Sequence, residues 1–159
     1  MAIYLTLDGI DGPISKPADG VDKAIELNSV SFGVGCHLTK EKGQGFKRQK
    51  EPAISEISVG KISDKATTNL FKEICGGTFF KKGEITVTKL VGGTATPFFK
   101  LSMEEVFISG WSISSGGESP SESLSMAFNK VKVSFNAEED GKLAGFVDAG
   151  WDLKADAKW

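Results

Sequence analysis

The sequence predicts a mainly β protein, built as a two-sheet β-barrel or β-sandwich with one short α-helix packed at its side. The first observation is a pair of long runs of alternating apolar and polar residues, on either side of a Ser- and Gly-rich loop over 114–121. Successive side chains of a strand point to opposite faces, so this period of two is typical of strands with one apolar face. Two such strands need a second sheet, or closure into a barrel, to cover those faces.

The composition is the second observation. The 159 residues include 19 glycines and only 5 prolines, with 40% hydrophobic and 25% charged residues. These values are typical of a turn-rich globular domain, and the length fits one domain, which we expect to span residues 1–159. The formal net charge of −2 gives no reason to expect nucleic acid as a partner.

The N-terminal segment MAIYLTLDGIDG has neither the basic region nor the long apolar core of a signal peptide, and its alternation predicts a first strand. No apolar run is long enough to span a bilayer, so we expect no membrane insertion. We therefore expect the chain to fold in the cytoplasm and to be secreted without a cleaved signal peptide. Cys36 and Cys75 belong to no CxxC pair, and we expect two free thiols.

The same alternation places the remaining strands. Besides the two long runs, we expect strands over 3–7, 25–34, 53–62, 84–90 and 143–153. In the first long run, Glu105 and Ser109 interrupt one apolar face, made by Phe99, Leu101, Met103, Phe107, Trp111 and Ile113. In the second, the apolar residues change from even-numbered to odd-numbered positions near Asn129 and Lys130. This change predicts a β-bulge or a strand that passes from one sheet to another. A similar change near Asn28 predicts a second bulge.

One helix is predicted in the segment that follows Ile62. Asp64 is the expected N-cap, with Ser63 as the competing choice, and the pair Gly76-Gly77 is expected to end the helix. A single apolar stripe is formed by Leu70, Phe71, Ile74 and Cys75. A helix of about three turns is marginal alone, so we expect this stripe to dock onto a sheet face or a barrel opening.

Residues 35–52 differ in character and are expected to form an extended basic loop. They contain five basic side chains against two acidic ones, and few apolar residues besides Leu38 and Phe46. A loop of this length inside a compact domain is often functional. Two interpretations remain open at this point: a solvated mobile loop, or an arm that orders only against a partner.

No pattern in the sequence predicts a catalytic, cofactor or metal site. His37 is the one histidine, and no GxSxG motif accompanies it. Glu104 and Glu105 lie next to each other in a predicted strand, where they would face opposite sides and could not act as an acid/base pair. We therefore expect a scaffold or a binding surface rather than an enzyme.

A resemblance to a known family begins in the segment SEISVGKISDKATTNLFKEICGGTFF, from Ser55 to Phe80. A strand is followed by Lys, Asp-Lys, Thr and Asn-Leu before the helix, at Val59, Lys61, Asp64, Lys65, Thr68, Asn69 and Leu70. Further matching features follow in order: Ile85–Lys89, Gly92-Gly93, Glu105-Val106, Ser109, Ser115–Gly117, Glu122, Leu124, Met126, Phe128 and Gly150–Leu153. The chain therefore resembles, over nearly its whole length, the haemolysin-coregulated protein (Hcp) family, the tube proteins of type VI secretion systems. The departures lie in Asp11–Lys23 and Gly35–Glu51.

This resemblance implies that six copies form a ring and that rings stack into the inner tube of a contractile machine. The expected partners are other copies of the chain, the sheath, the spike and small effector proteins carried in the lumen, with no cofactor. Within such a ring, we hypothesise that Phe46, Lys47 and Arg48 contact the adjacent subunit. Two alternatives remain: a tube protein of a phage tail or another contractile injection system, and a monomeric β-sandwich that binds sugar or peptide through Trp111 or Trp151.

Overall fold

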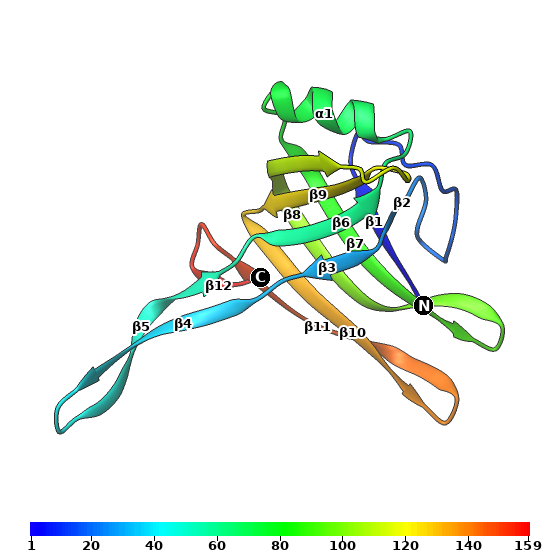
Figure 1. The fold of residues 1–159 in the computed structure, drawn as a ribbon. Helices are drawn as coiled ribbons and strands as arrows, with labels where there is room; N and C mark the ends of the chain where they lie inside the picture. The colour runs from blue at the N-terminus through cyan, green and yellow to red at the C-terminus, as the bar shows by residue number, and fades with distance from the viewer.

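Two β-sheets enclose a common core in the computed structural model, which describes residues 1–48 and 51–159 (Figure 1). The elements follow in the order β1 (Ala2–Leu7), β2 (Ile25–Leu27), β3 (Ser29–Ser31), β4 (Val34–Glu41), β5 (Gly45–Ile54), β6 (Ile57–Ile62), α1 (Thr67–Cys75), β7 (Phe80–Val91), β8 (Thr94–Ser114), β9 (Ser121–Ala127), β10 (Lys130–Glu139), β11 (Lys142–Asp152) and β12 (Ala157–Lys158). The main sheet has the strand order β12-β11-β10-β8-β7-β1-β2, and the second sheet has the order β3-β6-β9-β8. This mainly β architecture with one short helix is the predicted fold class.

Strand β8 belongs to both sheets. Its first part pairs with β7 and β10 in the main sheet, and its last part, from Phe107, pairs with β9 in the second sheet. Glu105 lies at the change between them and has a positive φ of 53°. Its carboxylate accepts a hydrogen bond of 2.6 Å from Asn129, which stands between β9 and β10 where the chain crosses back to the main sheet. The predicted passage from one sheet to another near Asn129 is therefore confirmed, and two sheet crossings are joined by one hydrogen bond.

Two expectations about strand parity were wrong in detail. At Asn28 the chain does not bulge within one strand, because β2 pairs with β1 whereas β3 pairs with β6 in the other sheet. In β8, the left-handed conformation at Glu105 reverses the parity of the strand, so Val106 and Ile108 are buried in the core in place of Phe107. A second irregularity between Ile108 and Gly110 returns Trp111 to the core side.

Helix α1 docks on the core through a narrower stripe than expected. Leu70 is fully buried and Ile74 packs against the core, while Phe71 lies against Trp111 with ring centroids 5.6 Å apart and Cys75 is exposed. The helix is too short and too polar to cross a membrane.

The sequence predicts the C-terminal end of α1 correctly but not its N-cap. The N-cap is Ala66, not Asp64, because Asp64 instead accepts the Ala66 N–H at 2.8 Å and so caps the turn that leads into the helix. The end at Gly76-Gly77 is confirmed: Gly77, with φ of 66°, donates to Ile74 O, and Thr78 N donates to Glu73 O. This pair of bonds is the Schellman arrangement.

Residues 35–52 form part of a β-hairpin with one register shift, between Cys36 and Leu38, so the expected extended loop is corrected. Strands β4 and β5 pair with each other as a separate two-stranded sheet, which projects from the body of the molecule (Figure 1). Gly43 and Gly45 have φ of 86° and 76°, and such conformations allow the chain to reverse tightly between the two strands. The segment after Asp152 also folds back as β12 beside β11.

Candidate assembly surfaces

The reactive side chains that the sequence singled out lie apart from one another. His37 is on the exposed strand β4. Cys36 and Cys75 are free thiols, as predicted, and both are exposed. Glu104 lies 3.7 Å from Lys130, whereas Glu105 lies 2.7 Å from Lys154. Within the described residues, no group of three or more His, Cys, Asp or Glu side chains is placed to hold a metal ion. The surfaces available for contact with other molecules are therefore the candidate functional sites.

The hairpin β4–β5, here called the arm, has one apolar side. Directly opposed residues of an antiparallel pair share a side of the sheet, and the opposed pairs in the arm include Val34 with Ile54, Leu38 with Arg48, and Lys40 with Phe46. Ile54 packs against the core, so this side, here called the inner side, continues from the interior of the protein. Its apolar members are exposed: Val34 at 65%, Leu38 at 55% and Phe46 at 70%.

The structure separates the three residues predicted to contact a neighbour. Phe46 and Arg48 lie on the inner side of the arm, whereas Lys47 lies on the opposite side, where its Nζ is 2.8 Å from Glu41 Oε2. Lys40 adds a positive charge 5.4 Å from the Phe46 ring centroid. Of the ion pairs among the described residues, none involves Lys40, Lys42 or Arg48.

The hairpin β10–β11 carries a second uncovered apolar surface. Val133 lies opposite the core residue Leu101, and Phe135 lies opposite Phe99, so all four share the core side of the main sheet. The second sheet nevertheless leaves part of this side in water, here called the apolar strip: Val133 exposed at 37%, Phe135 at 50% and Val147 at 78%. Val147 belongs to the same side because it lies opposite Phe135.

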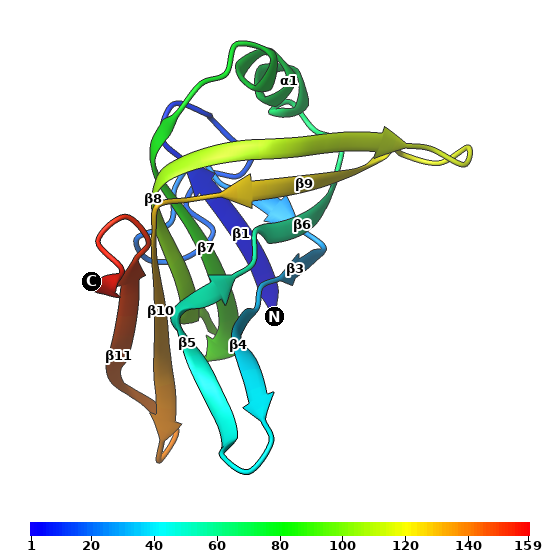
Figure 2. The same ribbon diagram turned by 90° about the vertical axis from the view of Figure 1, so that its left-hand side faces the viewer.

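A pocket of about 250 Å³ lies where the arm and β10–β11 diverge. The arm and its base contribute one wall and β10–β11 the other, and the lining is mostly apolar: Phe32, Val34, Pro52, Ile54, Val131, Val133, Ala149 and Trp151. Both hairpins leave the body at the same end of the molecule, as two views at right angles show (Figures 1 and 2). The tip of β10–β11 is acidic, and Glu139 and Asp140 take part in none of the ion pairs among the described residues.

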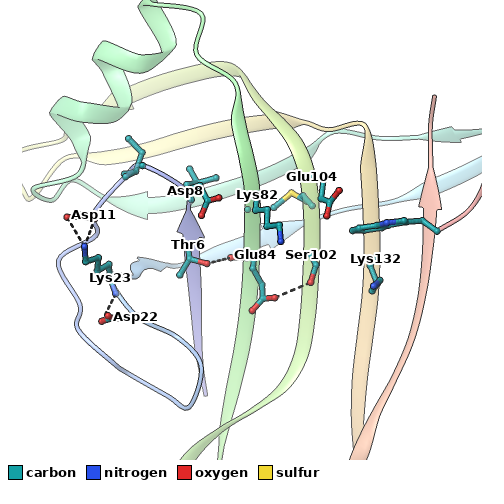
Figure 3. A pocket seen from close by; sticks show the side chains of 16 residues that line it. Thr6, Asp8, Asp11, Asp22, Lys23, Lys82, Glu84, Ser102, Glu104 and Lys132 are labelled. Atoms are coloured by element: carbon teal, nitrogen blue, oxygen red, sulfur yellow. Dashed lines mark hydrogen bonds and ion pairs between the residues drawn. The ribbon is translucent and has the colours of Figure 1, made fainter. Parts of the chain in front are cut away.

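The outer face of the main sheet is polar and charged. Thr6, Glu84, Ser102 and Lys132 are opposed across four neighbouring strands and therefore form a row on this face (Figure 3). Ser102 donates to Glu84 at 3.1 Å, and the floor of a shallow hollow of about 610 Å³ includes this row. Cations and carboxylates alternate and pair here, as in the 3.2 Å contact between Lys100 and Glu84. This face can remain hydrated in an assembly.

A buried ion pair, not predicted as a pair from the sequence, holds the entry to α1. Lys61 continues the buried side of β6 and places Nζ 3.0 Å from Glu122 Oε2 on β9, with both side chains fully buried. Burial by itself raises the pKa of Glu122, but hydrogen bonds from Thr67, Lys61 and Ser63 outweigh burial and hold that pKa below its usual value. The alternation of Ile57, Val59 and Lys61 was the available signal, because it places the lysine on the core side.

Comparisons with known proteins agree with this fold. A family model described as "Type VI secretion system effector, Hcp" matches residues 4–135. Protein hcp1 of Pseudomonas aeruginosa is 29% identical over 105 residues, which are 64% of this chain and 65% of that protein's length. A solved structure of a type six secretion system protein superposes with a TM-score of 0.88 at 26% identity, covering 99% of both chains. The crystal structure of Hcp1 from Salmonella typhimurium shares the fold, with a TM-score of 0.79 at 22% identity over 99% of this chain and 98% of that one.

Proposed function

The chain belongs to the Hcp family of type VI secretion proteins, and we propose that it is a structural subunit of a secretion tube rather than an enzyme. In this proposal, six copies form a ring, rings stack into a tube, and the tube is expelled with small effector proteins in its lumen. Its other partners are the sheath and the spike of the secretion machine. The subunit folds in the cytoplasm and leaves the cell as part of the tube.

The observation that carries this proposal is the pair of projecting hairpins with uncovered apolar sides. The apolar side chains of Phe46 and Val147 are 70% and 78% exposed to water in the single chain. Exposed apolar patches of this kind mark surfaces that contact other molecules. The hairpins extend away from the body (Figure 2), which gives a neighbouring copy access to both apolar sides.

A monomeric ligand-binding domain is less well supported. Trp111 packs against Phe71 below the helix, whereas Trp151 lines the pocket at the base of the arm, so the two indoles do not form one aromatic patch. A tube protein of a phage tail would share this architecture, and the family match to a type VI secretion component favours the secretion tube.

The mass of the purified protein in solution tests the proposal. Light scattering should give a mass near six chains, and negative-stain images of the same sample should show annular particles. A single-chain mass at high protein concentration would contradict the ring. Phe46→Ser with Arg48→Glu should reduce the assembled fraction, because both side chains lie on the inner side of the arm. Lys47→Glu is the matched control, since Lys47 lies on the opposite side.

A further inference from the structure

We propose that the inner side of the arm in one copy packs onto the apolar strip of β10–β11 in a second copy. Within one chain the two hairpins diverge and do not pack on each other. The contact would supply this sheet-on-sheet packing between two chains. This inference rests on the proposed ring and names the surface that receives the arm.

The two surfaces are extensions of the two sheets that already pack together in the body. The arm connects β3 to β6, both strands of the second sheet, and β10–β11 belongs to the main sheet. Packed sheets lie about 10 Å apart, with interdigitated side chains between them. In the body this packing buries Ile57 of the second sheet and Leu101 of the main sheet. Beyond the pocket of about 250 Å³ the hairpins separate, and the same two sides become exposed.

The chemistry of the two surfaces is complementary. Each presents three exposed apolar side chains: Val34, Leu38 and Phe46 on the arm, and Val133, Phe135 and Val147 on the strip. At the ends of the hairpins the charges are opposite, with Lys40 and Lys42 on the arm and Glu139 and Asp140 on β10–β11. An acidic rim beside an apolar strip fits a basic, apolar partner, and the arm of a second copy has both properties.

The arrangement of the hairpins allows this contact to repeat. Both project from the same end of the molecule and diverge from each other (Figures 1 and 2), so copies related by a rotation about an axis that runs from that end to the opposite end keep arm and strip at the same level. Each copy then gives its arm to one neighbour and receives an arm from the other. Such a contact joins two different surfaces, and it forms a closed ring when the rotation closes.

Cross-linking between differently labelled chains tests the inference. In a Cys36→Ser, Cys75→Ser background, Phe46→Cys is introduced in one tagged chain and Val147→Cys in another, and the mixed assembly is treated with a short bismaleimide. Both sites are highly exposed, so neither change should disturb the fold. We expect a cross-linked dimer carrying both tags.

The controls move each cysteine to the opposite side of the same strand. Lys47→Cys replaces Phe46→Cys, or Asp148→Cys replaces Val147→Cys, and the yield of mixed dimer should fall at least tenfold. Assembly to six chains without cross-linking above these controls would overturn the inference and leave the proposed ring intact. A protein that stays monomeric would overturn both.

Exchange of charge between the two surfaces is a second test. Glu139→Lys alone and Lys42→Glu alone should each raise the protein concentration needed for half-assembly several-fold. In the double variant the opposite charges are restored, and we expect recovery to within about twofold of the unmodified protein. Glu118→Lys, on the exposed loop between β8 and β9, is the matched control and should leave assembly unchanged. Additive effects in the double variant would contradict the pairing of these ends.

Discussion

At the scale of single residues, the least expected feature is the buried charge of Lys61. Its ammonium group donates to Glu122 at 3.0 Å, to Ile62 O at 2.9 Å and to Thr67 Oγ1 at 3.3 Å, so its three protons all have acceptors. Burial of an isolated charge is very costly, and only such complete pairing makes the site tolerable. The pair therefore joins β6, β9 and the first turn of α1 through one buried cluster.

Removal of one partner should be strongly destabilising. We expect Glu122→Gln to lower the free energy of unfolding by up to about 3–5 kcal/mol, because Lys61 loses its fully buried partner and keeps only Asp64, whose partly exposed carboxylate lies 3.3 Å from Nζ. Glu41→Gln removes an exposed ion pair with Lys47 and should cost about 0–1 kcal/mol. Denaturant unfolding at one fixed protein concentration measures both changes. Equal decreases in the free energy of unfolding would show that the buried pair stabilises the protein no more than the exposed pair does.

The depressed pKa of Glu122 also predicts how this difference depends on pH. A carboxyl whose pKa is lower in the folded protein contributes stability at pH values above its unfolded pKa, which is about 4.5. That contribution is lost as the pH falls through the lower, folded pKa. The stability difference between the unmodified protein and Glu122→Gln should therefore be constant from about pH 8 to 6 and shrink below about pH 4. A difference that grows on acidification would contradict this assignment.

At the scale of elements, α1 depends on the sheet rather than on its own propensity. It has nine residues, and its N-cap makes no side-chain hydrogen bond to the helix. Isolated helices of this length are marginal in water, so the burial of Leu70 and the contact of Phe71 with Trp111 supply its stability. The helix in turn covers the end of the core between the two sheets.

The central contact of this helix can be tested by truncation. Leu70→Ala should destabilise the protein by about 2–5 kcal/mol, since the fully buried side chain leaves a cavity that its neighbours fill only in part. Lys72→Ala, two residues away on the exposed surface of the same helix, should change stability by no more than about 0.5 kcal/mol. Thermal and denaturant unfolding of the two variants provide the comparison, and a small effect at Leu70 would show that α1 is dispensable to the core.

At the scale of the whole molecule, the body and the arm are separable. Gly35 and Ala53 are opposed in the arm, so residues 36–52 can be replaced by a two-residue Asn-Gly turn without moving the strands that remain. The shortened protein should retain a β-type circular dichroism spectrum and a cooperative unfolding transition. Its mass in solution should be that of one chain, because Leu38 and Phe46, two of the three exposed apolar side chains of the arm, are gone. A shortened protein that still assembles would show that the arm is not needed for contact between copies.

The sequence by itself determined the local features of this protein. Its alternating runs predicted the mainly β fold with one helix, and its ordered set of short matches, from Val59 to Leu153, indicated the family that the comparisons identify. The parity change near Asn129 predicted a sheet crossing, and Gly76-Gly77 predicted the end of α1. These features depend on neighbours in the chain, which explains why they could be inferred from spacing and residue type.

The tertiary structure alone decided which sides of the strands are covered. Alternation shows that Val59 and Val133 each lie on an apolar side, but only the position of the second sheet leaves the first in the core and the second in water. Likewise, Lys61 and Glu122 become an ion pair only because β6 and β9 are adjacent, although the two residues are 61 positions apart in the chain. The reversal at Glu105 and the position of the apolar strip have the same cause. Each depends on contacts between segments far apart in sequence, and a local pattern does not contain that information.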